Sequence, residues 1–278
     1  MKKIISLGAI ALILTFNACQ KENVVNPSNI DKVSDSNNNS SSKKVFINEF
    51  DIVGQIHDAV FQSVASNPDV SDLSTDQIFS QTKLIVARDG GKQLSAAVNG
   101  LNEADIIAIL DGEITNTVLN KTFGEVISTS FANGEITSKE KQILLNLNNI
   151  FENPSTPATV HTRVEQLEKN VIVRNDMTLL EKRRVLVVLS VARHSLRFWE
   201  VETNNPNTNF RFGDDVIGVG GEVQLFGFLA VAIKDVIGAF TGYEIIGDNC
   251  SSIFPDNPTL CCVGGAIAGA VQGSFLLG

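Results

Sequence analysis

The chain has 278 residues, 43% of them hydrophobic and 19% charged, which is enough for one or two domains with a sizeable core. Its formal net charge is −9 at pH 7, with 31 acidic against 22 basic side chains. A phosphate-binding face needs clustered Lys and Arg, so this balance argues against nucleic acid as a partner. One Trp and one Tyr also leave little material for a base-stacking platform.

Residues 1–18 have the layout of a bacterial signal peptide. Lys2 and Lys3 supply a positive start, and Ile4–Phe16 is an apolar stretch that is short for a membrane span. Ala18 and Cys19 follow. This order resembles the lipobox of bacterial lipoproteins, in which the Cys is diacylated and becomes the mature N-terminus. The resemblance implies lipidation at Cys19; the alternative is an ordinary secretory signal that is cleaved nearby and leaves Cys19 free.

The residues after Cys19 favour a surface lipoprotein with a flexible arm. Gln20, Lys21 and Glu22 follow directly, and Cys-Gln-Lys-Glu resembles the export signal of surface lipoproteins in Bacteroidetes-type bacteria. This resemblance implies an outer-membrane protein that faces outward, with the membrane as its partner through the lipid. Residues 19–45 are rich in Asn and Ser and hold too little apolar surface to offset the entropy of ordering, so we expect a disordered tether.

Residues 46–205 are predicted to form a helical domain, because apolar residues recur at helical spacing and no segment alternates as a strand does. In the first helix the apolar stripe includes Phe50, and Asp51 and Asp58 are expected to face away from it. Further helices are expected at residues 75–88, 102–110, 113–131, 137–151, 156–171 and 177–201. Most begin at a recognisable cap, namely Ser74 or Thr75, Asn102, Thr137 with Glu140, Thr156 before Pro157, and Asp176 followed by Thr178 with Glu181.

Residues 206–278 are predicted to form a Gly-rich, apolar helical hairpin. Its two segments carry glycine every four residues: Gly238 and Gly242 in the first, and Gly265, Gly269 and Gly273 in the second. On a helix this spacing makes a groove where another helix approaches closely. The pattern resembles glycine-zipper segments of envelope lipoproteins and, more loosely, small Gly-rich bacteriocins. The sequence leaves three possible partners for this hairpin: the helical domain of the same chain, a second copy of the protein, or a membrane.

Three more cysteines lie near the C-terminus. Cys250 with Cys261 or Cys262 would close a loop of about a dozen residues, and the oxidising envelope favours such a disulfide over free thiols. No His or further Cys lies at ligand spacing, so we expect no zinc site. Residues 133–140 match only the second half of an EF-hand loop, and calcium binding is not expected either.

One polar and aromatic string stands out in the last helix of the helical domain. Arg193, His194, Arg197 and Trp199 are candidates for a binding surface. The alternative is that Trp199 closes the core while the arginines pair with carboxylates. His57 lies on the apolar stripe of the first helix and is expected to be a core residue. No catalytic residue and no cofactor is predicted, because Gly-x-Ser-x-Gly is absent and the Ser-x-x-Lys strings lack their partner motifs.

These observations predict an all-α protein. Its expected function is that of a non-enzymatic envelope lipoprotein whose Gly-rich hairpin mediates self-association, as in a homo-oligomer, or membrane contact; a small-molecule ligand is not specified. Under this hypothesis Gly269→Leu disrupts assembly. A secreted pore-forming or antibacterial protein and an enzyme with an unrecognised site are the alternatives.

Overall fold

The computed structural model describes residues 48, 50–65, 73–154, 156–203, 205, 211–212, 215–216, 222–251 and 258–276. The signal peptide, Cys19 and the tether, predicted for residues 1–45, lie outside these described residues.

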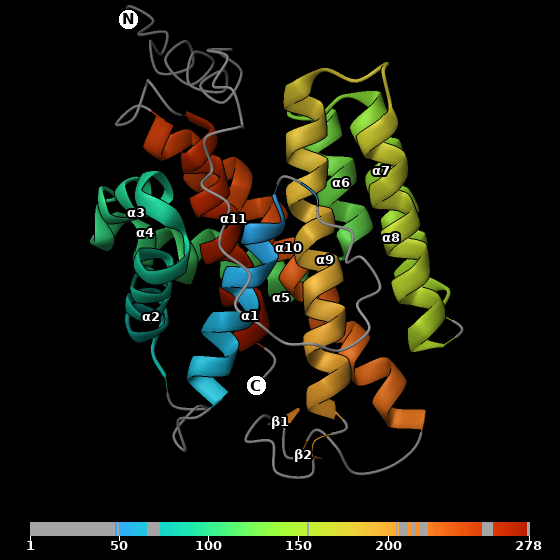
Figure 1. Cartoon of the computed structure of the whole chain (residues 1–278), viewed down its shortest axis with the longest axis horizontal. Coiled ribbons are helices and arrows are strands. Elements are labelled where there is room, and N and C mark those ends of the chain that lie inside the picture. Colours follow the sequence, from blue (N-terminus) through green and yellow to red (C-terminus); the bar gives the residue numbers. More distant parts are fainter. Residues whose placement is uncertain are drawn as a thin grey trace, which may run out of the picture.

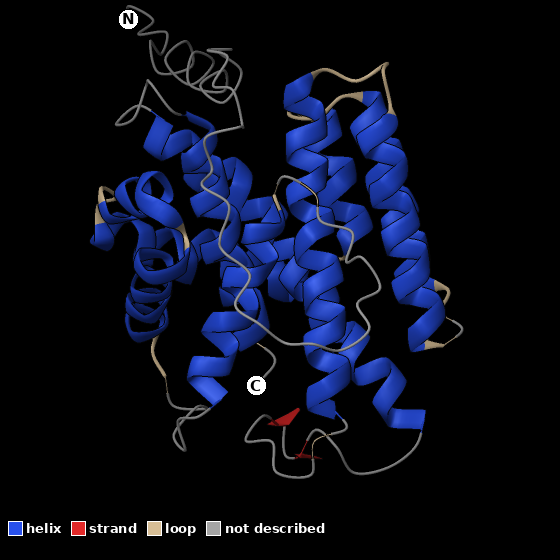
Figure 2. Ribbon diagram, in the orientation of Figure 1, coloured by secondary structure: helices blue, strands red, loops and turns tan. Residues whose placement is uncertain are grey.

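The described part of the chain is all-α, as predicted, and Figure 2 shows helices in nearly all of it. The only strands among the described residues are two-residue segments that pair antiparallel, β1 (Arg211–Phe212) with β2 (Asp215–Val216). The helices are α1 (Asp51–Ala65), α2 (Thr75–Asp89), α3 (Gly91–Asn99), α4 (Glu103–Ile109), η5 (Leu110–Ile114, a π-helical turn), α5 (Thr115–Asn120), α6 (Phe123–Ala132), α7 (Ser138–Glu152), α8 (Pro157–Val173), α9 (Leu179–Thr203), α10 (Glu222–Ser251) and α11 (Pro258–Phe275).

Several helices begin where the caps in the sequence predict. Ser74 precedes α2 and its backbone N–H donates to the Gln77 side chain at 2.9 Å. Thr137 and Glu140 form a reciprocal capping box at α7, and Thr156 before Pro157 caps α8. At α9 the cap is Thr178 with Glu181, because the Thr178 N–H donates to Glu181 Oε2 at 2.6 Å. Asp176, the other predicted cap, instead forms an ion pair with Arg174 at 2.7 Å.

The prediction for residues 102–131 was wrong in its boundaries. Residues 103–120 form one continuous helical stretch, in which Gly112 lies within η5 and the Thr115 hydroxyl donates to the Leu110 carbonyl at 2.6 Å. The chain then breaks at Lys121, whose backbone is extended, and α6 begins after it. Thr122 and Glu125 make a capping box there. A capping box inside an apolar run therefore marks the true helix boundary.

Two groups of helices flank a central layer (Figure 1). In this view α2, α3 and α4 lie on one side and α6, α7 and α8 on the other, with α1, α9 and the pair α10–α11 between them. The hairpin α10–α11 contacts α9 through α10, and α1, α2 and α3 through α11. Helices α1 to α9 are called the jacket below, because they surround the hairpin.

Jacket and hairpin share one hydrophobic core. The same cluster of buried side chains includes Phe61 of α1, Leu189 of α9, Phe240 of α10 and Ile267 of α11. Residues 262–274 of α11 are buried without a break. Of the partners left open by the sequence, the hairpin thus packs on the helical domain of its own chain.

Glycine backbones form the contact between α10 and α11. A Cβ atom built on Gly238 would lie 2.0 Å from the Gly269 carbonyl oxygen, and one on Gly242 would lie 2.2 Å from that of Gly265. Gly273 faces the Lys234 carbonyl in the same way, at 2.3 Å. These glycines allow the two helices to touch within one chain, so their faces are already occupied. Cys262, near the start of α11, is in a disulfide, and the side chains of Cys250 and Cys261 lie outside the description.

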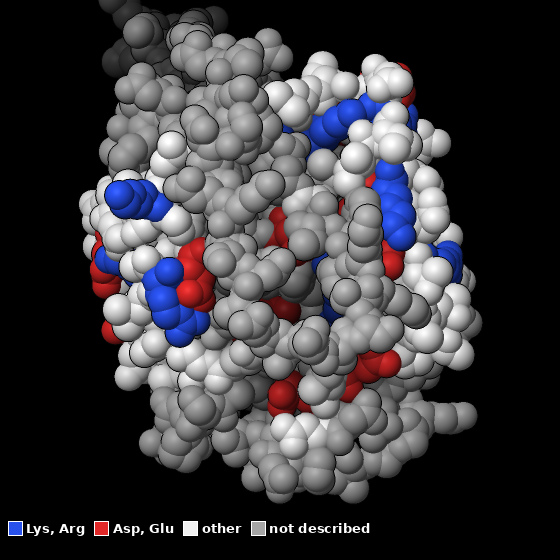
Figure 3. Space-filling model, viewed as in Figure 1, with Lys and Arg blue, Asp and Glu red and all other residues white. Residues whose placement is uncertain are grey.

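Among the helices in the described ranges, none is both long and apolar enough to be a candidate membrane span. In the view of Figure 3, Lys and Arg are interspersed with Asp and Glu, and neither sign of charge gathers into one patch on the visible described surface.

Candidate functional site

The most unusual feature of the interior is a polar network that joins α1, α8, α9 and the hairpin. Charged side chains are almost never buried unless they are paired, so a cluster of them identifies a site that needs a physical account. The network consists of Asn48, Asp51, His57, Asp58, Glu168, Arg193, His194, Ser195, Trp199, Asp235 and Ser274.

Helix α9 organises the network because its character changes after Ala192. Val185 to Ala192 are all buried and, apart from Ser190, apolar. Arg193, His194 and Ser195 then occupy three successive positions and point in different directions around the helix. Ser195 and Trp199, one turn apart, share a face and reach the same acceptor on α10.

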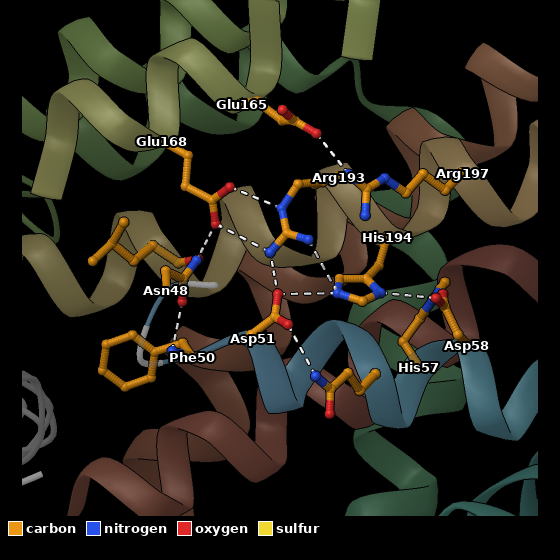
Figure 4. A network of polar contacts seen from close by, with 12 residues as sticks. Asn48, Phe50, Asp51, His57, Asp58, Glu165, Glu168, Arg193, His194 and Arg197 are labelled. Carbon is orange, nitrogen blue, oxygen red and sulfur yellow. Dashed lines mark hydrogen bonds and ion pairs between the residues drawn. The ribbon is translucent and has the colours of Figure 1, made fainter. Parts of the chain in front are cut away.

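Arg193 is the centre of the first half of the network (Figure 4). Its side chain is 1% exposed, its Nε donates to Glu168 Oε2 at 2.9 Å, and its Nη2 donates to Asp51 Oδ1. Glu168 also accepts from the Asn48 amide. The buried guanidinium pairs with both carboxylates, which leaves one negative charge among the three groups, and it fixes α1 and α8 against α9.

His194 bridges two carboxylates of α1. Its Nδ1 lies 2.8 Å from Asp58 Oδ2, and its Nε2 lies 3.0 Å from Asp51 Oδ1 (Figure 4). Gly54 makes this position possible, since a Cβ atom there would lie 2.3 Å from the imidazole ring. The absence of a side chain at Gly54 is therefore part of the site.

His57 connects α1 to the hairpin. The ring is fully buried, with Nδ1 3.2 Å from Asp58 Oδ1 and Nε2 3.2 Å from Asp235 Oδ2. The second contact is an ion pair whose angle lies outside hydrogen-bond geometry. Asp235 also accepts from Ser195 Oγ at 2.5 Å, Trp199 Nε1 at 3.0 Å and Ser274 Oγ. His57 is a core residue, as expected, but the polar groups beside its ring are the carboxylates of Asp58 and Asp235.

The titrations of the network are coupled through these contacts. Burial opposes protonation of His57, but the Asp235 and Asp58 carboxylates outweigh it and raise its pKa to about 9. For His194 too, burial lowers the pKa, and Asp51 and Asp58 overcome it and raise the pKa. Burial raises the pKa of Asp51, but His194 and Arg193 bring it down to about 2. His57 is thus a cation at neutral pH, and the two carboxylates beside His194 favour its protonated form.

The charges of the network nearly balance when both histidines are protonated. Asp51, Asp58, Glu168 and Asp235 then contribute four negative charges, and Arg193, His57 and His194 contribute three positive charges. Neutral histidines would leave three buried carboxylates and the half-buried Asp58 with a single buried cation, which is costly in a medium of low dielectric constant.

A second ionic contact joins the jacket to the hairpin nearer the N-terminal end of α9, at Arg184. Arg184 Nη1 donates to Glu140 Oε1 of α7 at 2.7 Å, and Arg184 Nε lies 2.5 Å from Glu244 Oε1 of α10. Its guanidinium also lies 5.9 Å from the centre of the buried Tyr243 ring. Burial disfavours the charged guanidinium, but Glu244 and Glu140 outweigh it and raise its pKa.

The network has histidine, serine and aspartate in one place, but its connectivity differs from that of an activated nucleophile. Nucleophilic catalysis needs a base that accepts the proton of the hydroxyl group. Here the Ser195 hydroxyl donates to the Asp235 carboxylate, and His57 approaches the same carboxylate from another side. Within the described residues, no group of three or more His, Cys, Asp and Glu side chains is arranged to hold a metal ion.

The structure bears on two expectations about candidate residues. Arg193 and Trp199 are buried, and His194 nearly so, which agrees with the alternative of a closed core with paired arginines and corrects the candidate binding surface. Arg197 is the exposed member and pairs with Glu165 at 2.6 Å. Asp51, expected to face away from the core, is also buried.

Most of the acidic partners could not be predicted from local sequence patterns. Asp51 and Glu168 meet Arg193 from positions 142 and 25 residues away. Among the acidic residues of the network, only Asp235 was marked by its sequence context. It is a charged residue inside an apolar stretch, and such a residue needs a partner when it is buried.

No protein-family model matches the chain, and neither a curated protein nor a solved structure is significantly similar to it. The network and the hairpin are therefore interpreted from their own geometry.

Proposed function

We propose that this chain is a non-enzymatic lipoprotein of the bacterial outer membrane, anchored through Cys19, whose Gly-rich hairpin makes a second contact with the membrane. One observation carries the proposal: a self-contained apolar hairpin is stored inside a helical jacket. The glycines of α10 and α11 let the backbones of the two helices meet directly. The buried apolar side chains in the described part of the hairpin belong to the same core cluster as those of the jacket.

The geometry favours membrane contact over self-association through the glycines. Each groove that the glycine spacing creates is filled by the facing helix of the same chain, so a second copy would have to displace it. A hairpin that leaves the jacket exposes side chains such as Phe228, Ile237 and Ile267. Exposing each of these side chains to water costs roughly 1.5–3 kcal/mol relative to the buried state. The hairpin therefore needs another apolar environment, which a lipid bilayer supplies.

The polar features agree with a non-enzymatic role. The Ser195, His57 and Asp235 side chains are fully buried, and each satisfies charge or hydrogen bonding of another. The net charge of −9 disfavours nucleic acid as a partner, and on the described surface visible in Figure 3 the basic side chains are mixed with acidic ones.

The anchor and the hairpin are tested separately. The intact mass of the protein extracted from membranes should show a diacylated residue at the N-terminus after cleavage before Cys19. The lipidated protein is then placed in liposomes that contain a photoactivatable phospholipid, and labelled peptides are mapped by mass spectrometry. Labelling of residues 222–251 and 258–275 is expected, with residues 138–173 of α7 and α8 as the internal reference. Labelling confined to the N-terminal lipid region contradicts the hairpin contact.

The stored hairpin also favours a second candidate, a protein that permeabilises membranes. The same liposomes loaded with a fluorescent dye distinguish the two functions. Labelling of the hairpin without dye release supports a contact that leaves the bilayer sealed, whereas release at protein-to-lipid ratios near those of the labelling supports a pore.

A further inference from the structure

Asp235 is the point where the hairpin is tied to the jacket. It is fully buried on α10, and three groups of the jacket lie 2.5 to 3.2 Å from it: the donors Ser195 Oγ and Trp199 Nε1, and His57 Nε2, which forms an ion pair with it. A fourth contact, from the Ser274 hydroxyl of α11, belongs to the hairpin itself. Three of the four contacts therefore cross from hairpin to jacket.

The other charged groups near this point are occupied elsewhere. Asp58 of α1 contacts both His57 and His194, so it holds the histidine that faces Asp235. Lys234, next in sequence to Asp235, donates to the Val118 carbonyl of α5. The charge of Asp235 is thus opposed by His57 across the boundary and not by its neighbour on α10.

We propose that Asp235, with His57, Ser195 and Trp199, is a latch that holds the hairpin in the jacket and whose opening releases it. The proposal rests on the membrane contact proposed above and names what controls it. The contacts across the latch are directional and few, whereas the glycine contacts inside the hairpin do not involve the jacket. Opening the latch therefore weakens the interface between hairpin and jacket, which is otherwise held by apolar packing and by the Arg184–Glu244 pair, while the glycine contacts between α10 and α11 are kept.

The titrations define the conditions under which the latch stays closed. The stabilisation from protonated His57 is complete below its ordinary pKa and is lost as pH rises through its folded value of about 9. The pKa of Asp58 is lowered, because burial, which raises it, is outweighed by His194 and His57; the contribution of Asp58 is lost only toward strongly acidic pH. The latch thus stays closed from mildly acidic to neutral pH, and mild acid does not open it.

Two serines that donate to the same carboxylate provide a matched test. Ser195→Ala removes a contact between jacket and hairpin, while Ser274→Ala removes a contact within the hairpin. Hydrogen exchange of the full chain is measured without lipid, under conditions where exchange reports the opening equilibrium. We expect Ser195→Ala to speed exchange in α10 and α11 about tenfold or more relative to α6–α8, because the bond ends on a charged group. Ser274→Ala is expected to change this ratio less than about threefold.

Trp199→Phe provides an independent variant if Ser195→Ala does not fold, since it removes the N–H that donates to Asp235 and keeps one aromatic ring, although it also leaves a small cavity in the core. Equal effects of Ser195→Ala and Ser274→Ala, or exchange that rises equally in all helices, would overturn the latch.

The liposome labelling separates the latch from the proposed function. Faster exchange in Ser195→Ala together with increased labelling of the hairpin supports both. Faster exchange in a hairpin that never labels supports the latch and overturns the membrane contact. If the hairpin of the unmodified protein labels to the same extent as that of Ser195→Ala and Trp199→Phe, that outcome overturns the latch and leaves the membrane contact in place.

Discussion

The hairpin has two interfaces, and they depend on different forces. Between α10 and α11, backbones meet at Gly238, Gly242, Gly265 and Gly269, where no side chain fits. Between the hairpin and the jacket, apolar packing is combined with an ionic joint at Asp235. The first interface depends mainly on shape, with one described hydrogen bond to a charged group, from Ser274 to Asp235. The second depends in part on charges that must be paired, so it can be weakened while the first is kept.

This difference changes the meaning of the glycine spacing. The same pattern that predicted a contact with a second copy serves, in the structure, to join two helices of one chain. A hairpin that is complete in itself can be stored in the core or presented elsewhere as a unit. The predictions below separate the two interfaces, beginning with the steric one.

The largest effect is expected from Gly269→Leu. A Cβ atom at this position would lie 2.0 Å from the Gly238 carbonyl oxygen, and both atoms belong to buried helices that cannot move apart without exposing the core. We expect a loss of at least about 4 kcal/mol in the free energy of unfolding, measured by urea denaturation of the Cys19→Ala chain.

Gly124→Ala on α6 is the control for Gly269→Leu. Its new methyl group would meet only Asn148 Nδ2, at 3.6 Å, so the stability should stay the same or rise by up to about 1 kcal/mol. A Gly269→Leu protein with unchanged stability but a smaller oligomer would instead support self-association through the glycines.

Arg193→Met tests the ionic half of the comparison. The substitution keeps an apolar stem in the core and leaves Asp51 and Glu168 without their shared cation. Breaking a buried ion pair from one side costs about 3–5 kcal/mol, and we expect a loss of that size in the free energy of unfolding.

Arg197→Met, one turn further along α9, is the matched control for Arg193→Met. Arg197 is 43% exposed and pairs with Glu165 near solvent, so its loss should cost less than about 1 kcal/mol. Equal losses in the free energy of unfolding for the two variants would contradict the larger contribution expected of the buried ion pairs.

The dependence of stability on pH isolates His57. Because its pKa is raised to about 9, its contribution is fully present below pH 6.5 and is lost as the pH rises to 9. The free energy of unfolding should fall by about 3 kcal/mol over this range, and His194, whose pKa is also raised, contributes in the same direction. His57→Gln should be less stable at pH 6.5 and should show a flatter profile. A profile in the unmodified protein that is already flat above pH 7 would contradict the charged state of His57.

Local signals in the sequence predict much of this fold. Capping residues identify the starts of α2, α7 and α8, and the all-apolar stretch before Arg193 marks α9 as a buried helix. The glycine spacing locates the contact between the two last helices.

The network was largely invisible because its partners are far apart in the chain. An amphipathic stripe places Asp51 on the outer face of α1, and only tertiary packing brings Arg193 over it, 142 residues later. Spacing within one helix carries no information about a contact of that kind. Gly54, needed for the approach of His194, likewise has no local reason to be small.

The smallest expected effect concerns the boundary that the sequence reading missed. Thr122 accepts the Glu125 N–H at 3.2 Å, and the Thr122 N–H donates to Glu125 Oε2 at 2.8 Å. Thr122→Ala should cost about 1 kcal/mol and speed amide exchange in the first turn of α6. Thr162→Ala is the control, since its hydroxyl bonds only the Ala158 carbonyl within α8 and its loss should be nearly neutral. If both variants behave alike, α6 begins at residue 123 because of packing by Phe123 and not because of its cap, and the interruption after α5 is imposed by the core.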